Sequence, residues 1–380
     1  MHNIKQKFLK YIFSFVCFAF LGSCSQTGDY FKAGNAADIA ILLPMSGVEA
    51  EMGMEYAKMI KMGIKDSAAS KIKVTIYDSA NQEALEDSLD KILNRGTDII
   101  IGPIYSGPTK IVAEKAGSKG IITISFSNNP TLAEQNLFIY GHAPMRQLEQ
   151  ITNYFLDNGH KNYIALLPSG KHSNVVSKIL REMIIDGDGI LSRLELYGAS
   201  PEDIKSSVKI VSETASQLNE SDLNLTQPVI LIADDPVTLE MVYANIRKYG
   251  LDKKAIIAGD SRINIDSPFN TNISFTGTLG VANEKLAARA RKAGVRHISF
   301  MHALAYDAGK MTGKYIGKRY NKEEFLTRMN SKEEFIGIAG RIHFIDSIAQ
   351  RKYDVIRKEN GIYVGDVKRG YGRSSPVHSR

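Results

Sequence analysis

The sequence predicts an α/β fold made of two lobes, each with a doubly wound parallel sheet, joined by crossover segments. Short runs of β-branched and other apolar residues alternate with longer amphipathic segments, which is the pattern of strands and helices in parallel sheets. The short runs are almost entirely apolar, as expected for strands covered by helices on both faces. The length of 380 residues exceeds the usual size of one domain and agrees with two lobes.

The first block of this alternation spans roughly residues 38–142. Its helical segments carry apolar residues three and four positions apart, so that Leu85, Leu89 and Ile92 share one stripe. We predict strands at 38–43, 73–77, 98–101 and 121–125, and helices at 52–66, at 82–94 and from Pro108 onward.

The second block, roughly 143–272, repeats the same rhythm. We predict helices at 146–158, 173–186, 201–218 and 236–249, and strands at 163–167, 190–196, 229–233 and 255–258. The segment Asp186-Gly-Asp-Gly189 is predicted to be a helix-ending turn with its glycines at positive φ, because it lacks the final Glu of a calcium loop.

The last third of the chain has fewer elements. It is predicted to hold a strand at 275–281, a helix at 302–318 and an antiparallel pair of 341–344 with 353–357. No third sheet is available for these pieces, so we expect them to return to the first two lobes. The predicted division is 38–142 plus 281–335 for lobe one and 143–280 plus 336–366 for lobe two.

The N-terminus has the layout of a secretory signal peptide. Three lysines precede the uncharged apolar run 11–21, which is shorter than the about 20 residues that a membrane-spanning helix needs. The run ends in Leu21-Gly22-Ser23-Cys24, which resembles the bacterial lipobox, in which the signal is cleaved before a lipidated cysteine. Residues 1–24 are therefore predicted to be a lipoprotein signal peptide and 25–37 a polar tether.

Lipidation of Cys24 would hold the protein at a membrane of the bacterial cell envelope, on the periplasmic side. Ser25, in place of an aspartate, resembles the pattern of lipoproteins exported to the outer membrane and favours that membrane. The alternative is a cysteine that merely follows a signal peptide.

The basic charge does not indicate a nucleic-acid-binding domain. The chain carries 48 Lys and Arg against 41 Asp and Glu, for a net charge of +7. Three of the basic residues lie in 1–24 and four in the predicted flexible tail 367–380, so the body between them is neutral. The two cysteines, Cys17 and Cys24, provide no disulfide framework and no metal cluster in the body. We predict no metal, no cofactor and no nucleic-acid partner.

Five short motifs resemble the type I periplasmic binding proteins of the Leu/Ile/Val-binding group. In chain order they are IAILLPMSG at 39–47, IGPIYS at 101–106, ITISFSNNP at 122–130, YDA at 306–308 and GRIHF at 340–344. Their order and spacing extend the resemblance over about residues 38–365. That family also includes the penicillin-binding-protein activators, outer-membrane lipoproteins of the same two-lobed fold, and the receptor family ligand-binding regions. The resemblance implies two lobes that close on a ligand by hinge motion.

In doubly wound sheets, ligands bind at the carboxyl ends of the strands. The loops that follow the first-lobe strands are rich in Ser, Gly, Asn and Pro, and they hold the candidate ligand-binding residues Ser46, Ser106, Ser127 and Asn128. The resemblance places Ser106, Ser127 and Asn128 where the amino-acid binders hold the ligand's α-carboxylate. Plain helix capping by Ser and Asn is the alternative.

The resemblance also assigns candidate residues to lobe two. His172 falls at the position of an aromatic stacking residue, Asp235 in the loop of a second aromatic, and Asp260 where an acid pairs with the ligand ammonium. The two missing aromatic residues depart from the family pattern. Solvated loop residues are the alternative, above all for His172.

Catalytic signatures are absent from the sequence. It has no G-x-S-x-G, no H-E-x-x-H and no P-loop, and Ser206-x-x-Lys209 lacks the partner motifs of penicillin-binding enzymes. We therefore predict a non-enzymatic lipoprotein that binds an amino-acid-like molecule as a transport receptor and meets a permease. The alternative is an outer-membrane lipoprotein that activates a penicillin-binding protein, a peptidoglycan synthase, by protein contact.

Overall fold

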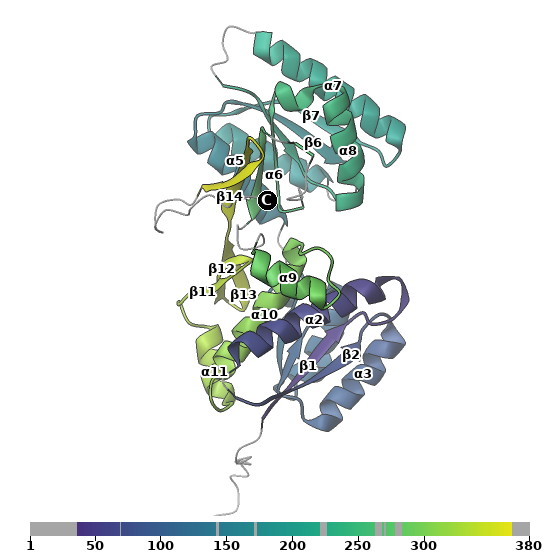
Figure 1. Cartoon of the computed structure of the whole chain (residues 1–380), viewed down its shortest axis with the longest axis vertical. Coiled ribbons are helices and arrows are strands. Elements are labelled where there is room, and N and C mark those ends of the chain that lie inside the picture. The colour runs from purple at the N-terminus through teal and green to yellow at the C-terminus, as the bar shows by residue number, and fades with distance from the viewer. Residues whose placement is uncertain are drawn as a thin grey trace, which may run out of the picture. The chain divides into compact units, whose positions relative to one another are not determined.

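The computed structural model shows two sheets, each with helices on both faces (Figure 1). The described residues belong to one compact unit, Ala36–Arg380. The structure describes residues 36–68, 70–141, 144–170, 173–220, 226–262, 268–269, 271–277 and 283–366.

The first sheet has eight strands, of which five neighbouring ones, β2-β1-β3-β4-β5, are parallel and β2 forms one edge. From edge to edge the strands are β11 (Phe335–Gly337), β12 (Gly340–Ile345), β13 (Ile348–Lys352), β5 (Leu137–Ile139), β4 (Ile122–Ser125), β3 (Ile99–Ile101), β1 (Ala37–Leu43) and β2 (Ile72–Asp78).

The second sheet has seven strands. The five strands β10 to β7 are parallel, and β14 and β15 add an antiparallel edge. From edge to edge they are β15 (Ile362–Asp366), β14 (Asp354–Glu359), β10 (Ile273–Gly277), β9 (Ile256–Gly259), β8 (Val229–Ile232), β6 (Asn162–Pro168) and β7 (Ile190–Tyr197). The chain changes sheets between β5 and β6, between β10 and β11, and between β13 and β14.

The helices divide between the two sheets. We call the first sheet with its helices the first half of the molecule and the second sheet with its helices the second half, whatever their order in the chain. Those of the first half are α2 (Ala50–Ser67), α3 (Gln82–Arg95), α4 (Ser106–Gly117), α9 (Glu284–Lys292), α10 (Phe300–Ile316) and α11 (Lys322–Met329). Those of the second half are α5 (Pro144–Asp157), α6 (Ser173–Asp186), α7 (Pro201–Glu220) and α8 (Pro236–Lys248). Short 3-10 turns are η1 (Gly47–Glu49), η2 (Pro130–Leu132) and η3 (Leu251–Lys253).

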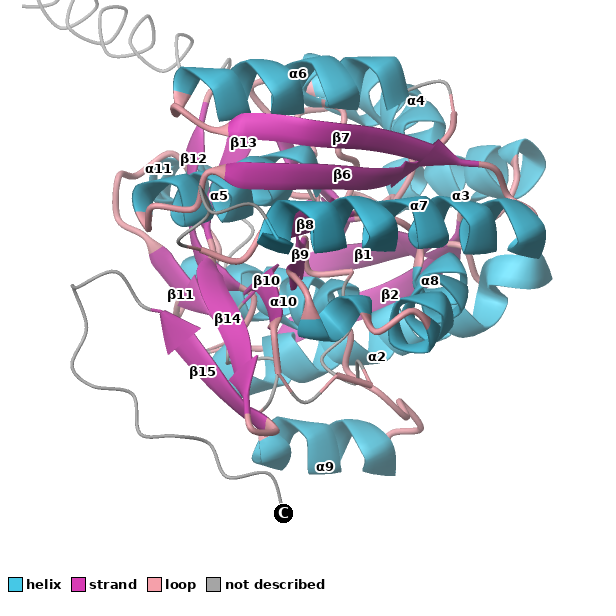
Figure 2. Ribbon diagram, turned by 90° about the horizontal axis from the view of Figure 1, so that it is seen from above, coloured by secondary structure: helices cyan, strands magenta, loops and turns pink. Residues whose placement is uncertain are grey.

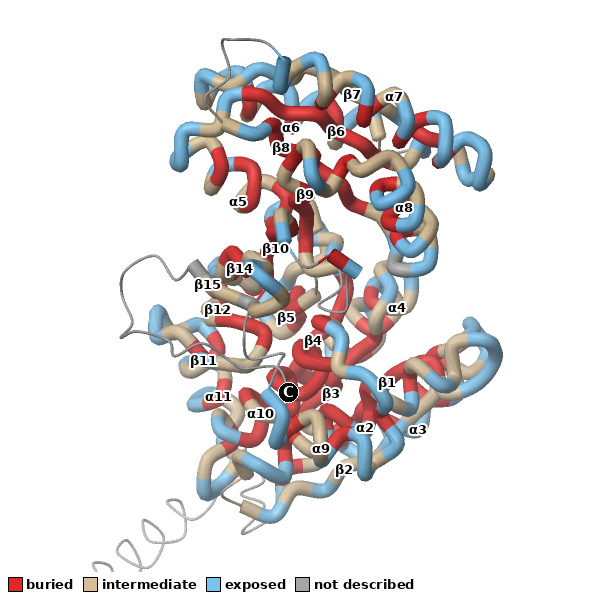
Figure 3. Tube along the Cα trace, turned by 45° about the horizontal axis from the view of Figure 1, so that its top comes forward, coloured by how far each residue is buried: buried red, intermediate tan, exposed pale blue. Residues whose placement is uncertain are grey.

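Each central strand is buried on both faces because its alternate residues pack into different cores. In β6, Ile164 and Leu166 join the core that includes residues of α7, whereas Tyr163 and Ala165 join the core that includes residues of α6. Figure 2 shows α6 and α7 on opposite faces of β6 and β7. Figure 3 shows the resulting pattern of buried strands and exposed outer helix faces. The apolar composition of the strands therefore has a direct structural cause.

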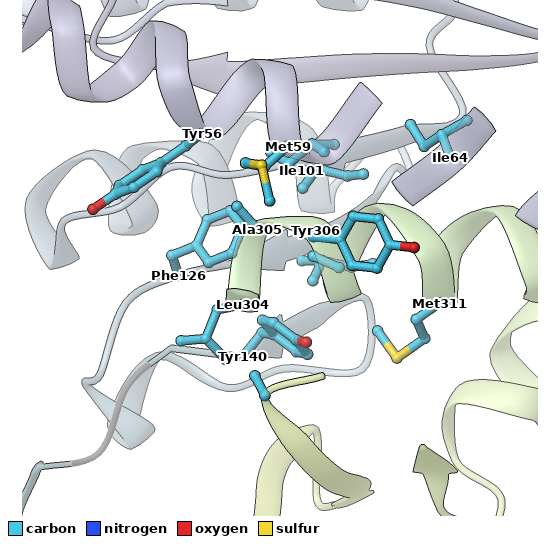
Figure 4. Packing of buried hydrophobic residues seen from close by; sticks show 14 of the residues in the cluster. Tyr56, Met59, Ile64, Ile101, Phe126, Tyr140, Leu304, Ala305, Tyr306 and Met311 are labelled. Carbon is cyan, nitrogen blue, oxygen red and sulfur yellow. The ribbon is translucent and has the colours of Figure 1, made fainter. Parts of the chain in front are cut away.

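Helices α2 and α10 pack closely because glycines lie at their contact. A Cβ on Gly63 would lie 2.0 Å from the Tyr306 carbonyl oxygen, and one on Gly309 would lie 2.1 Å from that of Ile60. Figure 4 shows Met59 of α2 near Ala305 and Tyr306 of α10 in the core of the first half. Neither glycine could become a larger residue unless the two helices moved apart.

The predicted fold class is confirmed, but the predicted division of the last third is wrong for residues 336–352. Strands β12 and β13 pair with each other and extend the first sheet through the contact of β13 with β5. The predicted pairing of 341–344 with 353–357 does not occur, since β14 pairs with β10 and β15. The reason is a tight hairpin at Asp346 and Ser347, both left-handed, with φ of 49° and 59°.

The turn after α6 is also corrected. Asp188, with φ of 57°, is left-handed there, whereas Gly187 and Gly189 are not among the glycines with positive φ. A Cβ on Gly187 would lie 2.6 Å from the Cδ1 atom of Leu156, so close packing rather than backbone conformation explains the glycine.

Candidate functional site

At the carboxyl end of the first sheet, the segments that follow β3 and β4 are joined by two hydroxyl groups. The Ser106 Oγ, in the first turn of α4, lies 3.0 Å from the Ser127 Oγ, which follows β4. Ser127 is 1% exposed, and its Oγ also accepts a hydrogen bond from the Asn129 N–H. Asn128, which lies between Ser127 and Asn129 in the sequence, is exposed. Ser106 and Ser127 therefore come together as predicted, and their hydroxyls bond each other.

Ser46 is placed differently. It precedes η1, is exposed, and lies beside the Asp78 carboxylate at the end of β2. Burial raises the pKa of Asp78, but the nearby Ser46 side chain and hydrogen bonds from the backbone N–H groups of Met45 and Ala80 outweigh it and lower the pKa. Ser46 thus stabilises the turn between β1 and α2.

The loops after β1 and β3, and the first half of α2, carry exposed apolar side chains. Val48 is 104% exposed, and Met54 and Tyr105 are 43% and 44% exposed. The Tyr105 hydroxyl donates to the Glu49 carboxylate, which joins the loop after β3 to the one after β1. Burial and the Glu49 charge raise the pKa of Tyr105 to about 12. We call Val48, Met54 and Tyr105 the apolar tip.

At the carboxyl end of the second sheet, Asp260 is fully buried and paired within the chain. Its two carboxylate oxygens accept hydrogen bonds from the Arg262 Nε at 3.0 Å each, and Oδ2 also accepts from Nη2 at 2.6 Å. A bidentate guanidinium–carboxylate pair is among the strongest pairings in proteins. Burial lowers the pKa of Arg262, but Asp260 outweighs this effect and raises it.

The neighbouring aspartates at the end of β8 have separate partners. The Asp234 Oδ2 accepts a hydrogen bond of 2.7 Å from the Tyr197 hydroxyl, and burial raises the pKa of Asp234. Asp235 is exposed and begins α8, where its carboxylate accepts from the N–H groups of Val237 and Thr238. The Thr238 hydroxyl is the largest cause of a lowered pKa at Asp235. Asp235 is therefore the N-cap of α8, a role that the sequence analysis did not assign to it.

Two predicted functional residues, His172 and Cys24, lie outside the described residues, as do Ser25 and the tail 367–380. The sequence analysis missed Arg262. A cation two positions after an acid at a strand end was the signal that could have found it, because the intervening turn brings the two side chains together. Tyr197, at the end of another strand, carried no local signal.

Two further observations concern the described part of the chain. No group of three or more His, Cys, Asp or Glu residues there is arranged to hold a metal ion. No helix among those described residues has the length and apolarity needed to cross a bilayer.

The two doubly wound sheets, with three passages of the chain between them, define the fold of the type I periplasmic binding proteins. One such structure, the substrate-binding protein LivJ of Streptococcus pneumoniae in complex with isoleucine, has a TM-score of 0.61 and 17% identity, covering 88% of this chain and 98% of that one. The C-domain of LpoA from Haemophilus influenzae, a regulator of PBP1A, also has a TM-score of 0.61, with 16% identity over 87% of this chain and 100% of that one. Equal scores mean that the fold is common to both kinds of protein.

The chain belongs to the LppC family. Residues 29–233 match the family described as LppC putative lipoprotein. The chain is also 45% identical over 368 residues to the uncharacterized protein RP748 of Rickettsia prowazekii, covering 96% of this chain and 98% of that protein. The description of the family as putative lipoproteins agrees with the lipobox-like motif in the sequence.

Proposed function

We propose that the protein is an outer-membrane lipoprotein, anchored through Cys24, that activates a peptidoglycan synthase of the penicillin-binding class by protein contact. The observation that carries this proposal is the ion pair between Asp260 and Arg262. In the amino-acid binders that the sequence resembles, the acid at this position pairs with the ammonium group of the ligand. Here the chain supplies its own cation.

A ligand ammonium would have to displace a guanidinium that makes three hydrogen bonds of 2.6 to 3.0 Å to a fully buried carboxylate. Displacement would leave Arg262, whose side chain is 33% exposed, without its bidentate partner. A ligand ammonium would be a poor substitute for the planar guanidinium, because it is a compact point charge and lacks the fixed pair of donors that matches a carboxylate. Amino-acid recognition is therefore disfavoured at this end of the second sheet.

The apolar tip supports contact with another protein. An exposed valine and tyrosine on two joined loops, and an exposed methionine in α2, provide apolar area and an aromatic anchor of the kind found at protein interfaces. Membership of the LppC family supports the same proposal, since the Haemophilus influenzae protein of this fold is a regulator of PBP1A.

A second candidate function, a transport receptor for an amino-acid-like molecule, is favoured by one observation. Ser106 and Ser127 lie together at the N-terminus of α4, where backbone N–H groups and hydroxyls can receive a carboxylate. The isoleucine complex of LivJ supports the same candidate.

The test measures glycan-strand synthesis by the bifunctional penicillin-binding protein of the same organism, with and without the full-length chain. We expect the chain to increase the rate and Val48→Asp to remove most of the increase, because a carboxylate at a buried interface lacks a partner. Ile185→Asp is the matched control, since Ile185 is 58% exposed but lies at the far end of α6 from the strand ends. An unchanged synthesis rate, together with a raised melting temperature in the presence of free amino acids, would favour the receptor instead.

A further inference from the structure

A buried polar cluster lies beside the passage of the chain from β13 to β14, and it takes no part in the sites described above. Arg351 is the penultimate residue of β13, and Tyr353 connects the two strands. Tyr140 directly follows β5, and Gln147 lies in α5. The four side chains therefore come from segments that border two of the three passages between the sheets.

Arg351 is partly exposed as a residue, but its guanidinium is incompletely paired and has buried nitrogens. Its Nη2 donates to the Tyr140 carbonyl oxygen at 3.2 Å, and its guanidinium carbon lies 4.8 Å from the centre of the Tyr140 ring. Within the described part of the chain, its Nε and Nη1 atoms are buried without a hydrogen-bond partner. Buried charges in proteins are usually paired and hydrogen-bonded, so these donors require an explanation.

Two neutral groups add further donors without acceptors. Tyr140 and Gln147 are both fully buried, and among the described residues neither the Tyr140 hydroxyl nor the Gln147 Nε2 has a partner. The orientation of the Gln147 amide is fixed, because its Oε1 accepts from the N–H and the hydroxyl of Ser261 at 2.9 Å each. The Nε2 is thus left as a donor. Figure 4 shows the Tyr140 ring among Phe126 and Leu304 in the core.

The Tyr353 hydroxyl connects these donors. Burial raises the pKa of Tyr353, while the neighbouring charge of Arg351 and the nearby side-chain donors of Gln147 and Arg351 lower it. Both groups therefore lie close to the Tyr353 oxygen and favour negative charge there. Asp307, a neighbouring carboxylate, does not meet this demand, because its oxygens accept from the N–H groups of Ile338 and Ala339.

We infer that Arg351, Gln147 and Tyr140 form a binding site for a small oxyanion, a carboxylate or a phosphate. Arginine and the amide nitrogen can only donate, so the missing partner is an acceptor, and the cationic guanidinium selects an anionic one. The site borders the turn that holds the Asp260–Arg262 pair, because Gln147 accepts from Ser261 in that turn, and it is formed by other residues than the apolar tip. It does not depend on the proposed regulation of a synthase. An oxyanion bound there joins segments of both halves of the chain beside a passage between them.

The test is thermal unfolding of the full-length chain in sodium acetate and in sodium phosphate, with sodium chloride replacing either salt at constant ionic strength. We expect a saturable rise in the melting temperature with at least one oxyanion, because a ligand that binds only the folded state stabilises it. Arg351→Met is expected to abolish the rise while the chain still folds, since an apolar side chain can replace a partly buried, incompletely paired cation.

Tyr140→Phe removes only the hydroxyl and is expected to weaken oxyanion binding by roughly 5- to 10-fold, the effect of one lost hydrogen bond. Tyr243→Phe is the matched control, because among the described residues the buried Tyr243 hydroxyl also lacks a partner but belongs to α8. Equal weakening in both tyrosine variants would overturn the inference. So would a melting temperature that does not respond to either oxyanion, which would indicate a site filled by water.

Discussion

Two buried aspartates, Asp307 in the first half of the molecule and Asp260 in the second, show how surroundings decide the use of the same side chain. Asp307 accepts two backbone N–H groups at 2.7 and 3.0 Å, and burial outweighs these bonds and raises its pKa to about 6. Asp260 instead holds the Arg262 guanidinium. The first carboxylate links α10 to the β11–β12 hairpin, whereas the second pairs with a guanidinium directly after β9.

The largest expected effect is at the second aspartate. Arg262→Met leaves a buried carboxylate without its cation and is expected to lower the free energy of unfolding by about 3 to 5 kcal/mol, measured by urea denaturation. Arg289→Met is the matched control, because the Arg289 pair with Asp66 is also bidentate but more exposed, and we expect a loss of about 1 kcal/mol or less. Equal losses in the two variants would show that Asp260 is not a desolvated charge.

The next effect concerns pH at the first aspartate. The folded pKa of Asp307 is about 6, above its ordinary value of 3.8, so the folded state holds a proton that the unfolded chain releases. Stability from this group is therefore present at low pH and is lost as the pH rises from about 4 to 6, by about 3 kcal/mol.

Asp307→Asn removes this titration and keeps the shape of the side chain. The measurement is the free energy of unfolding at pH 4, 5, 6 and 7 for both proteins, so that other groups cancel in the difference. The prediction fails if the two proteins show the same dependence on pH.

The smallest effect belongs to an exposed aspartate and sharpens the comparison. Asp235 caps α8 from the surface, and Asp235→Ala should cost about 1 kcal/mol of stability, since a lost N-cap leaves backbone N–H groups of the first turn to water. Glu240→Ala on the same helix is the control, with an expected change within about 0.5 kcal/mol. A loss as large as that of Arg262→Met would contradict the ranking by burial.

Much of the fold could be predicted because it depends on local periodicity. The alternation of apolar strands and amphipathic helices predicted the central strands of both sheets, apart from the short β5. The β14–β15 hairpin was missed although Asn360 and Gly361, with φ of 50° and 80°, are a strong hairpin signal. The β12–β13 hairpin had no comparable signal, because Asp346 and Ser347 are less common in such turns than Asn-Gly or Asp-Gly.

The candidate site was predictable only in part. The resemblance assigned Ser106, Ser127 and Asp260 to ligand binding, which stays a prediction; in the structure Ser106 begins α4 beside Ser127, and Asp260 directly follows β9. It could not predict that Arg262 neutralises Asp260, nor that Asp235 caps a helix, because side-chain pairing depends on turn geometry rather than on residue type. Arg351 and Gln147, far apart in sequence, gave no local signal at all.

By itself, the sequence determined the features that neighbouring residues control: strand and helix periodicity, most helix ends, the neutral body, and the N-terminal pattern around Cys24. The tertiary structure decided which sheet β11 to β13 join, which charge Asp260 faces, and which donors gather beside Tyr353. The physical reason is the separation along the chain over which each kind of interaction acts. Backbone preferences and amphipathic spacing act within a few residues, whereas sheet pairing and the desolvation of charges are set by segments that meet only after folding.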